Sequence, residues 1–268
     1  MMKITQEQVR QFDEDGYLFL RALLDDDEVD LLQRITEQSE QVANDSYTDR
    51  DAEGGFSRIW LTEELGDDVF STCAKCERIV DPMQQLLRDE VYQFHHKMML
   101  KDPRVGGAWE WHQDYGYWYQ DKLDGLLFPD TASCMIAVNR ATRENGCLQV
   151  IRGSHRLGRI EHGVTGTQAG TDPKRVEDAL KHLELVYCEM EPGDALFFHG
   201  NTLHRSDANR SDHPRWSYIS CYTTMSNATV SGSKTHIENR VIFGKVADVE
   251  LKKVGRKQLR DIKSAATG

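Results

Sequence analysis

Three pairs of residues place a histidine two positions before an acid: His112 and Asp114, His182 and Glu184, and His236 and Glu238. On a β-strand such a pair points to one face with Cα atoms about 6.6 Å apart, so both side chains could share a metal ion or a proton. His182 and His236 stand in charged, polar segments, which is typical of a solvated surface. The first pair stands in the aromatic segment AWEWHQDYGYWYQ, residues 108–120, which we expect as a strand. A lone carboxylate is costly to bury there, so this pair is the best candidate for metal or acid–base chemistry.

A third ligand would have to come from elsewhere in the chain. Segment 191–222 offers His199, after an apolar run, and His204, beyond GNTL. Two histidines and one carboxylate form the facial triad typical of non-haem Fe(II), which leaves coordination positions open. Either histidine could instead pack in the core. Spacing alone therefore leaves both the third ligand and the metal open.

The elements that would position these residues follow from local patterns. Thr5 followed by Gln8 is typical of a helix start, and a second helix is expected to begin near Asp25–Asp27. The run GYLFLRAL at 16–23 favours a strand between these helices. Residues 44–58 are polar and contain glycine, so we expect a loop, and residues 68–89 return to helical spacing.

From Glu90 onward, short strand-like runs alternate with turn sequences such as EPGD and NRSDHPR. Many short strands separated by turns indicate a sandwich, barrel or jelly roll. No linker demands a second domain. We therefore expect one domain over residues 1–268, with a helical part over 1–89, a core over about 90–225 and a charged tail over 226–268 whose structure the pattern leaves open.

Composition narrows the class of protein. A formal net charge of −11 argues against nucleic acid or an anionic membrane as a partner. No apolar run approaches the ~20 residues that span a bilayer, and the first residues lack the apolar region of a secretory signal. Six irregularly spaced cysteines do not form a disulfide pattern, and the lone C-x-x-C at 73–76 has no second pair to complete a zinc site. We expect a cytoplasmic protein.

Four motifs together resemble the phytanoyl-CoA dioxygenase family of Fe(II)/2-oxoglutarate-dependent oxygenases: HQD at 112–114, ENGCLQVIRGSH at 144–155, EPGDALFFHGNTLHRS at 191–206, and Arg215. The N-terminal segment EQVRQFDEDGYLFLRALLDDDEVDLL is similar to that family's helix–strand–helix, and the resemblance covers roughly residues 4–225. It implies an α+β fold with a mainly β core, a double-stranded β-helix (a cupin-like jelly roll) with flanking N-terminal helices. One departure is Arg152, where many members have proline before Gly-Ser-His.

The resemblance also implies a site. It makes His112, Asp114 and His204, rather than His199, the ligands of Fe(II), and it argues against halogenation, because related halogenases lack the carboxylate. Arg215 and Ser206 would bind the distal carboxylate of 2-oxoglutarate, a task that suits the planar fork of arginine. Lys97 aligns with a strand position that faces the co-substrate, although Lys101 could instead be the relevant cation.

The implied activity is hydroxylation of an unactivated C–H bond, with 2-oxoglutarate and O₂ giving succinate and CO₂. A small polar metabolite is the favoured substrate, for example a zwitterion such as 2-aminoethylphosphonate or its trimethylammonio analogue, because no extended basic stretch suggests a CoA site. An acyl-CoA hydroxylase is the alternative within the family. Alternatives of other classes are a non-catalytic jelly-roll binding module and a zinc or manganese cupin-type enzyme.

Four residues are candidates for substrate binding. Most rings of the 108–120 segment should be core, but Trp118 and Tyr115 could hold an ammonium group by cation–π contact. On an unbroken strand Trp118 would share the face of the metal pair, although a turn after Asp114 would change this. Arg58, in a glycine-containing segment, and Arg152 could bind an anionic group.

Overall fold

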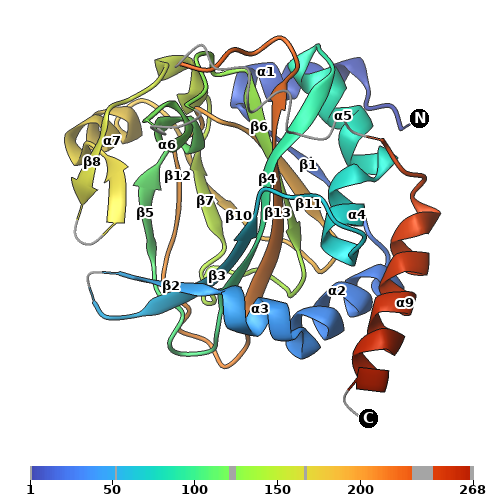
Figure 1. The fold of residues 1–268 in the computed structure, drawn as a ribbon. Coiled ribbons are helices and arrows are strands. Elements are labelled where there is room, and N and C mark those ends of the chain that lie inside the picture. The colour runs from blue at the N-terminus through green and yellow to red at the C-terminus, as the bar shows by residue number, and fades with distance from the viewer. Residues whose placement is uncertain (1, 52, 121–124, 166–167, 231–243, 266–268) are drawn as a thin grey trace.

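Two antiparallel sheets pack face to face in a computed structural model that describes residues 2–51, 53–120, 125–165, 168–230 and 244–265 (Figure 1). One sheet has seven strands in the order β1-β11-β6-β13-β4-β3-β2: Tyr17–Leu20, Ala195–His199, Thr131–Ala137, Arg215–Thr224, Val91–Lys101, Phe56–Thr62 and Tyr47–Arg50. The other has four, in the order β10-β7-β12-β5: Leu185–Cys188, Leu148–Ile151, His204–Ser206 and Trp109–His112. A separate hairpin joins β8 (His162–Thr165) to β9 (Gln168–Thr171). The jelly-roll prediction is confirmed.

Most helices cover the outer face of the seven-stranded sheet (Figure 1). They are α1 (Gln6–Asp15), α2 (Asp26–Gln38), α3 (Glu40–Asp45), α4 (Val69–Lys75), α5 (Glu77–Leu87) and α9 (Val249–Ala265). On the other side lie α6 (Asp114–Gln120), α7 (Pro173–Leu180) and a 3₁₀ turn at Ser154–Leu157. The expected cap of α1 is present: the Thr5 hydroxyl accepts from the Gln8 N–H, and the Gln8 side chain accepts from the Thr5 N–H.

Strand alternation divides the interior into two layers. Along β4, Met98 and Leu100 pack in the cluster beneath the helices, whereas Met99 packs in the cluster between the two sheets. Because neighbouring side chains on a strand point to opposite faces, Lys97 and Lys101 share the side of Met99. The inner layer can therefore hold polar chemistry while the outer layer stays apolar.

One segment differs from the sequence expectation, and the structure also assigns a helix to the tail, which the sequence pattern left open. Residues 44–58, expected as a loop, contain β2 and the start of β3, which pair across a turn that includes Gly54 at φ 90°. The charged tail carries α9, which packs along α2 and α4. Gly255 makes this packing close, since a Cβ there would stand 3.1 Å from Leu31 and 3.2 Å from Val69. The β2–β3 pair is a local hairpin that the polar composition of its segment hides, whereas α9 packs on helices far away in the sequence.

All six cysteines are buried free thiols, which agrees with packing as the role of the pair at 73 and 76. Among the described residues, no helix is both long and apolar enough to cross a membrane.

The docking of α9 leads to a stability prediction. Leu251 is fully buried in the helix-side core, while Val249, on the first turn of the same helix, is 71% exposed. We expect Leu251→Ala to lower the free energy of unfolding by about 2–5 kcal/mol. Val249→Ala should change it by less than about 0.5 kcal/mol. Urea unfolding of both variants tests this, and equal small effects would contradict a packed tail.

Candidate metal centre and its cavity

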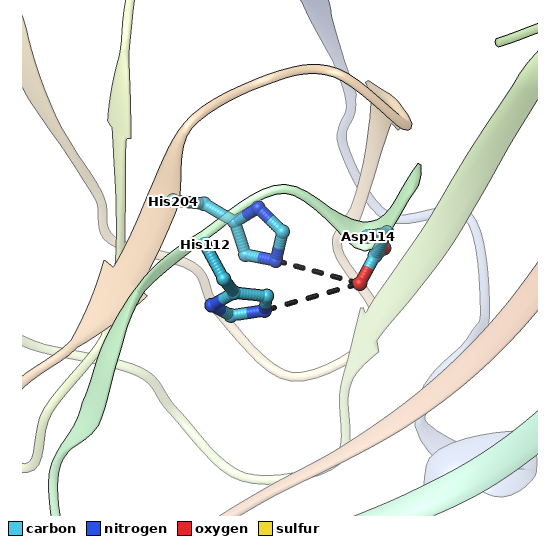
Figure 2. A group of neighbouring side chains, drawn as sticks. All are labelled: His112, Asp114 and His204. Atoms are coloured by element: carbon cyan, nitrogen blue, oxygen red, sulfur yellow. Dashed lines mark ion pairs between the residues drawn. The ribbon is translucent and has the colours of Figure 1, made fainter. Parts of the chain in front are cut away.

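His112 and His204 are cross-strand neighbours. His112 ends β5 and His204 begins β12, where the two residues pair directly, with ring centroids 4.0 Å apart. Asp114 is the first residue of α6, and its Oδ1 lies 3.9 Å from His112 Nε2 and 3.8 Å from His204 Nε2. Figure 2 shows both imidazoles directed at this carboxylate. All three side chains are buried.

Backbone carbonyls fix the tautomer of both histidines. His112 Nδ1 donates to Glu110 O at 2.7 Å, and His204 Nδ1 donates to Thr202 O at 2.9 Å. Burial lowers the pKa of both imidazoles, most strongly for His112, where the neighbouring His204 lowers it further. Each ring is therefore neutral near pH 7 and presents the Nε2 lone pair, which is the form that binds a metal.

The surroundings of Asp114 favour its ionised form. Burial would raise the pKa of Asp114, but His204, Lys97 and a 2.8 Å hydrogen bond from the Ser133 hydroxyl to Oδ2 outweigh it and lower the pKa. The remaining oxygen, Oδ1, faces the two imidazoles at distances too long for a hydrogen bond. One ligand atom from each of the three residues lies within 4.8 Å of the others, the one such group found in the described part of the chain. Two nitrogens and one oxygen, buried and unpaired with one another, fit an Fe(II) ion.

The prediction that His112 and Asp114 share one face of a single strand is wrong. We expected a strand through 108–120, but β5 ends at His112 and α6 begins at Asp114. The two side chains meet because the chain turns at Gln113, not because they alternate on one strand. His199 takes no part: its Nδ1 accepts from Asn201 N at 3.0 Å, and its ring packs near Phe12 and His155.

The other two histidine–acid pairs do not join the site. His182 is exposed just after α7. His236 and Glu238 lie outside the described residues.

The triad opens into a cavity between the sheets that is partly open to solvent. Besides the triad, polar side chains on its wall are Lys97, Arg205, Ser206 and Arg215. Its apolar and aromatic wall consists of Tyr47, Ile59, Met99, Trp109, Met135, Leu148, Phe198 and Ile219.

Arg215 is a buried cation without a carboxylate partner. Its side chain donates to Gly146 O from Nε at 2.9 Å and Nη2 at 2.7 Å, and to the Ser217 hydroxyl at 3.1 Å. No described residue supplies a carboxylate to it, and burial lowers its pKa to about 10, so it remains charged at pH 7. A buried charge of this kind is costly unless an anion joins it.

The two lysines of β4 occupy different places. Lys101 is fully buried behind Ser206, where its Nζ donates to the Ser206 hydroxyl at 2.8 Å and to Asp207 O at 2.6 Å. Burial, together with the charge of Arg215, lowers the pKa of Lys101 well below its usual value. Lys97 lines the cavity itself. Of the two cations, Lys97 is the one placed to meet a ligand.

Trp118 and Tyr115, expected to bind substrate, are not on the cavity wall. Because Asp114 starts a helix, the strand parity used to place Trp118 does not apply. Trp118 is buried against Phe94 and His95, with ring centroids 5.3 and 5.7 Å away. The Tyr115 hydroxyl donates to Leu127 O at 2.6 Å. Both rings are core, and the expectation is corrected.

Arg58 and Arg152 are also placed elsewhere. On β3, Ile59 faces the cavity, so Arg58 points to the opposite face, where it pairs with Asp102 at 3.0 Å. Arg152 pairs with Glu184 at 2.8 Å and lies 3.4 Å from Asp15. Neither guanidinium reaches the cavity. Tyr47 and Ile59 do reach it. Tyr47 was missed because residues 44–58 were expected as a loop, and Ile59 directly follows that segment.

A jelly roll that carries a buried His-Asp-His triad defines the class of non-haem, Fe(II)/2-oxoglutarate-dependent dioxygenases, and the chain is an enzyme of this class. The family model "Phytanoyl-CoA dioxygenase (PhyH)" matches residues 12–217, and the chain belongs to this family.

Relatives with stated activities agree with this class. L-proline trans-4-hydroxylase of Streptomyces griseoviridis is 26% identical, over 81% of this chain and 85% of the relative. Ectoine dioxygenase of Halomonas elongata is 27% identical, over 85% and 72%. The structure of EctD from S. alaskensis with 2-oxoglutarate and 5-hydroxyectoine is 25% identical and covers 84% of this chain and 78% of that one, with a TM-score of 0.72.

The ligand assignment leads to a test. We expect His204→Ala to weaken Fe(II) binding beyond the about 10–100-fold typical of residues that only orient ligands. The control variant is His199→Ala, which changes the histidine at the end of β11, five positions before His204. It should bind iron like the wild type. Anaerobic Fe(II) titration with metal analysis of both variants decides between them. Loss of iron in His199→Ala with retention in His204→Ala would reverse the assignment.

Proposed function

We propose that this dioxygenase hydroxylates a C–H bond of a small, polar, zwitterionic metabolite, of which 2-aminoethylphosphonate is one representative. The observation that carries the proposal is Arg215: a buried guanidinium to which no described residue supplies a carboxylate, on the wall of the same cavity as the triad.

Arg215 and Ser206 would bind the distal carboxylate of 2-oxoglutarate. The Ser206 oxygen accepts from Lys101 Nζ, so its own hydroxyl hydrogen is free to point at an anion. Arg215 supplies the charge, and its attachment to Gly146 O holds the guanidinium in place. A positioned hydroxyl and a fixed cation together suit one carboxylate group.

Lys97 would meet the same co-substrate nearer the triad. Burial alone would lower the pKa of Lys97, but the negative charge of Asp114 outweighs this, and the pKa is raised. The ammonium is therefore a stable cation. Within the described part of the chain it donates no hydrogen bond to a protein group.

Fe(II), when bound by the triad, supplies the redox chemistry by which 2-oxoglutarate, O₂ and R–H give succinate, CO₂ and R–OH. The chain positions the reactants and surrounds them with apolar side chains. Met135, Leu148 and Phe198 line the cavity beside the triad and exclude water from it. Ser133 holds Asp114 so that only Oδ1 is offered to the metal.

A small substrate agrees with the cavity and with the relatives. The cavity must also accept 2-oxoglutarate, and among its described lining residues there is no run of cations that would bind the phosphates of CoA. Two of the relatives are named for ectoine and L-proline, both small molecules, although a Caenorhabditis elegans relative named "Probable phytanoyl-CoA dioxygenase" is 26% identical.

Arg215 gives the sharpest test of co-substrate binding. Arg215→Lys keeps the charge but loses the fork, so the KM for 2-oxoglutarate should rise about 10–100-fold, since a charged hydrogen bond contributes about 1.5–3 kcal/mol. Arg140→Lys, a surface arginine paired with Glu191, serves as the control and should leave this KM unchanged. Succinate formation at varied 2-oxoglutarate provides the measurement, and an unchanged KM in Arg215→Lys would refute the role.

The substrate class needs a screen. We expect succinate release above background with small amino, quaternary-ammonium or phosphonate compounds, confirmed by an added mass of one oxygen in the product. Acyl-CoA thioesters run in parallel. Turnover confined to the thioesters would replace the small-substrate proposal by the acyl-CoA alternative. Fe(II) binding without succinate from any compound would indicate a non-catalytic module.

A further inference from the structure

Gln113 lies between the metal ligands His112 and Asp114. Its side chain points away from the cavity and is fully buried. Gln113 uses its whole amide: Nε2 donates to Gly158 O at 2.8 Å and to Asn201 O at 2.7 Å, and Oε1 accepts from Ile160 N at 2.7 Å. Asn201 stands three residues before His204. The Gln113 side chain therefore ties the turn between His112 and Asp114 to the segment that carries the third ligand.

His162, at the start of β8, fixes the backbone of the same turn. Its Nε2 accepts from Gln113 N at 3.0 Å, and its Nδ1 donates to Ile160 O at 2.9 Å. Its ring stacks edge-on against Tyr117 at 5.1 Å, and the Tyr117 ring lies 5.2 Å from that of His112. Both the backbone and the side chain of Gln113 are thus held by residues outside the triad.

Gly116 makes room for His162. A Cβ at Gly116 would stand 1.9 Å from His162 Cε1 and 2.2 Å from its Nδ1. Glycine within a helix normally costs about 1 kcal/mol relative to alanine, so its presence in α6 has a packing reason. Any other residue at this position would displace the His162 ring from Gln113.

We propose that Gln113 and His162, with Gly116 as the space for the ring, are positioning residues that hold His112 and Asp114 at the separation the metal requires. The inference rests on the proposed function, because it concerns the same iron ligands. Neither side chain is on the cavity wall, so neither touches substrate or co-substrate. Residues that orient metal ligands typically contribute about 10–100-fold to metal affinity, which sets the expected size of the effect.

The first experiment compares two glycines: Gly116 in α6, which faces the His162 ring, and Gly163, which follows His162 in the chain. In Gly116→Ala the new methyl group strikes the ring, whereas at Gly163, the next residue after His162, a Cβ would meet nothing within 4 Å. We expect Gly116→Ala to weaken Fe(II) binding about tenfold or more in anaerobic titration. Gly163→Ala should bind as the wild type. The KM for 2-oxoglutarate should change little in either, because Arg215 and Ser206 lie on other strands, while kcat falls in Gly116→Ala.

A second set separates positioning from general stability. His162→Gln can still accept from Gln113 N, so it should retain more Fe(II) affinity and more of the visible Fe(II)–2-oxoglutarate absorption band than His162→Leu, which cannot. In the double variant Gly116→Ala with His162→Ala, the clash is gone. It should therefore bind iron no more weakly than His162→Ala alone.

The outcomes are distinguishable. Variants that remain folded by circular dichroism and bind Fe(II) like the wild type would overturn the positioning role, as would equal affinities of His162→Gln and His162→Leu. A wild-type protein that binds iron but forms no succinate would instead overturn the proposed function, with the positioning role still measurable through Fe(II) affinity.

Discussion

The direct pairing of His112 with His204 across β5 and β12 determines the rest of the site. Two neutral imidazoles 4.0 Å apart, each with one nitrogen bound to a backbone carbonyl, aim two lone pairs at one point in a buried region. Asp114 adds a negative oxygen to the same point. These three acceptor atoms face the same cavity, and a divalent cation is a partner that would satisfy all of them at once. The strand register that makes the fold therefore also makes the metal site.

Because side chains alternate along the long strands, residues that attach the helices lie on one face of the sheet and residues that line the cavity lie on the other. On β13, Tyr218 and Tyr222 point to the helix side, and their hydroxyls donate to Phe70 O at 2.6 Å and Ala74 O at 2.8 Å, which fastens α4 to the sheet. Arg215 and Ile219 on the same strand face the cavity. Because the outer face is fixed by helices and by buried hydrogen bonds, the inner face can hold an arginine in one position, as the proposed binding of a carboxylate requires.

The sequence was informative where the chemistry is carried by residue type and motif, and uninformative where it depends on distant packing. The capping box at Thr5, the strand-rich core and the three residues of the triad could all be predicted, the last through a family pattern. The turn at Gln113 could not, because its cause is His162, 49 residues away, bonded to the Gln113 N–H. Arg58 was misplaced in part for a similar reason: its face is set by β3, which pairs with the distant strand β4 as well as with the neighbouring β2.

The charges of the cavity explain why its inner end suits a dianion. Lys97 and Arg215 present two positive charges and Asp114 one negative charge, so this region is cationic within a protein of net charge −11. A bound divalent metal would increase the excess of positive charge. A dicarboxylate offsets it, which is the physical basis for the proposed co-substrate pose, whereas a neutral or singly positive molecule would not be held there. The proposed substrate would then meet the remaining wall of the cavity, where the ring of Tyr47 is half-exposed and that of Trp109 is partly exposed.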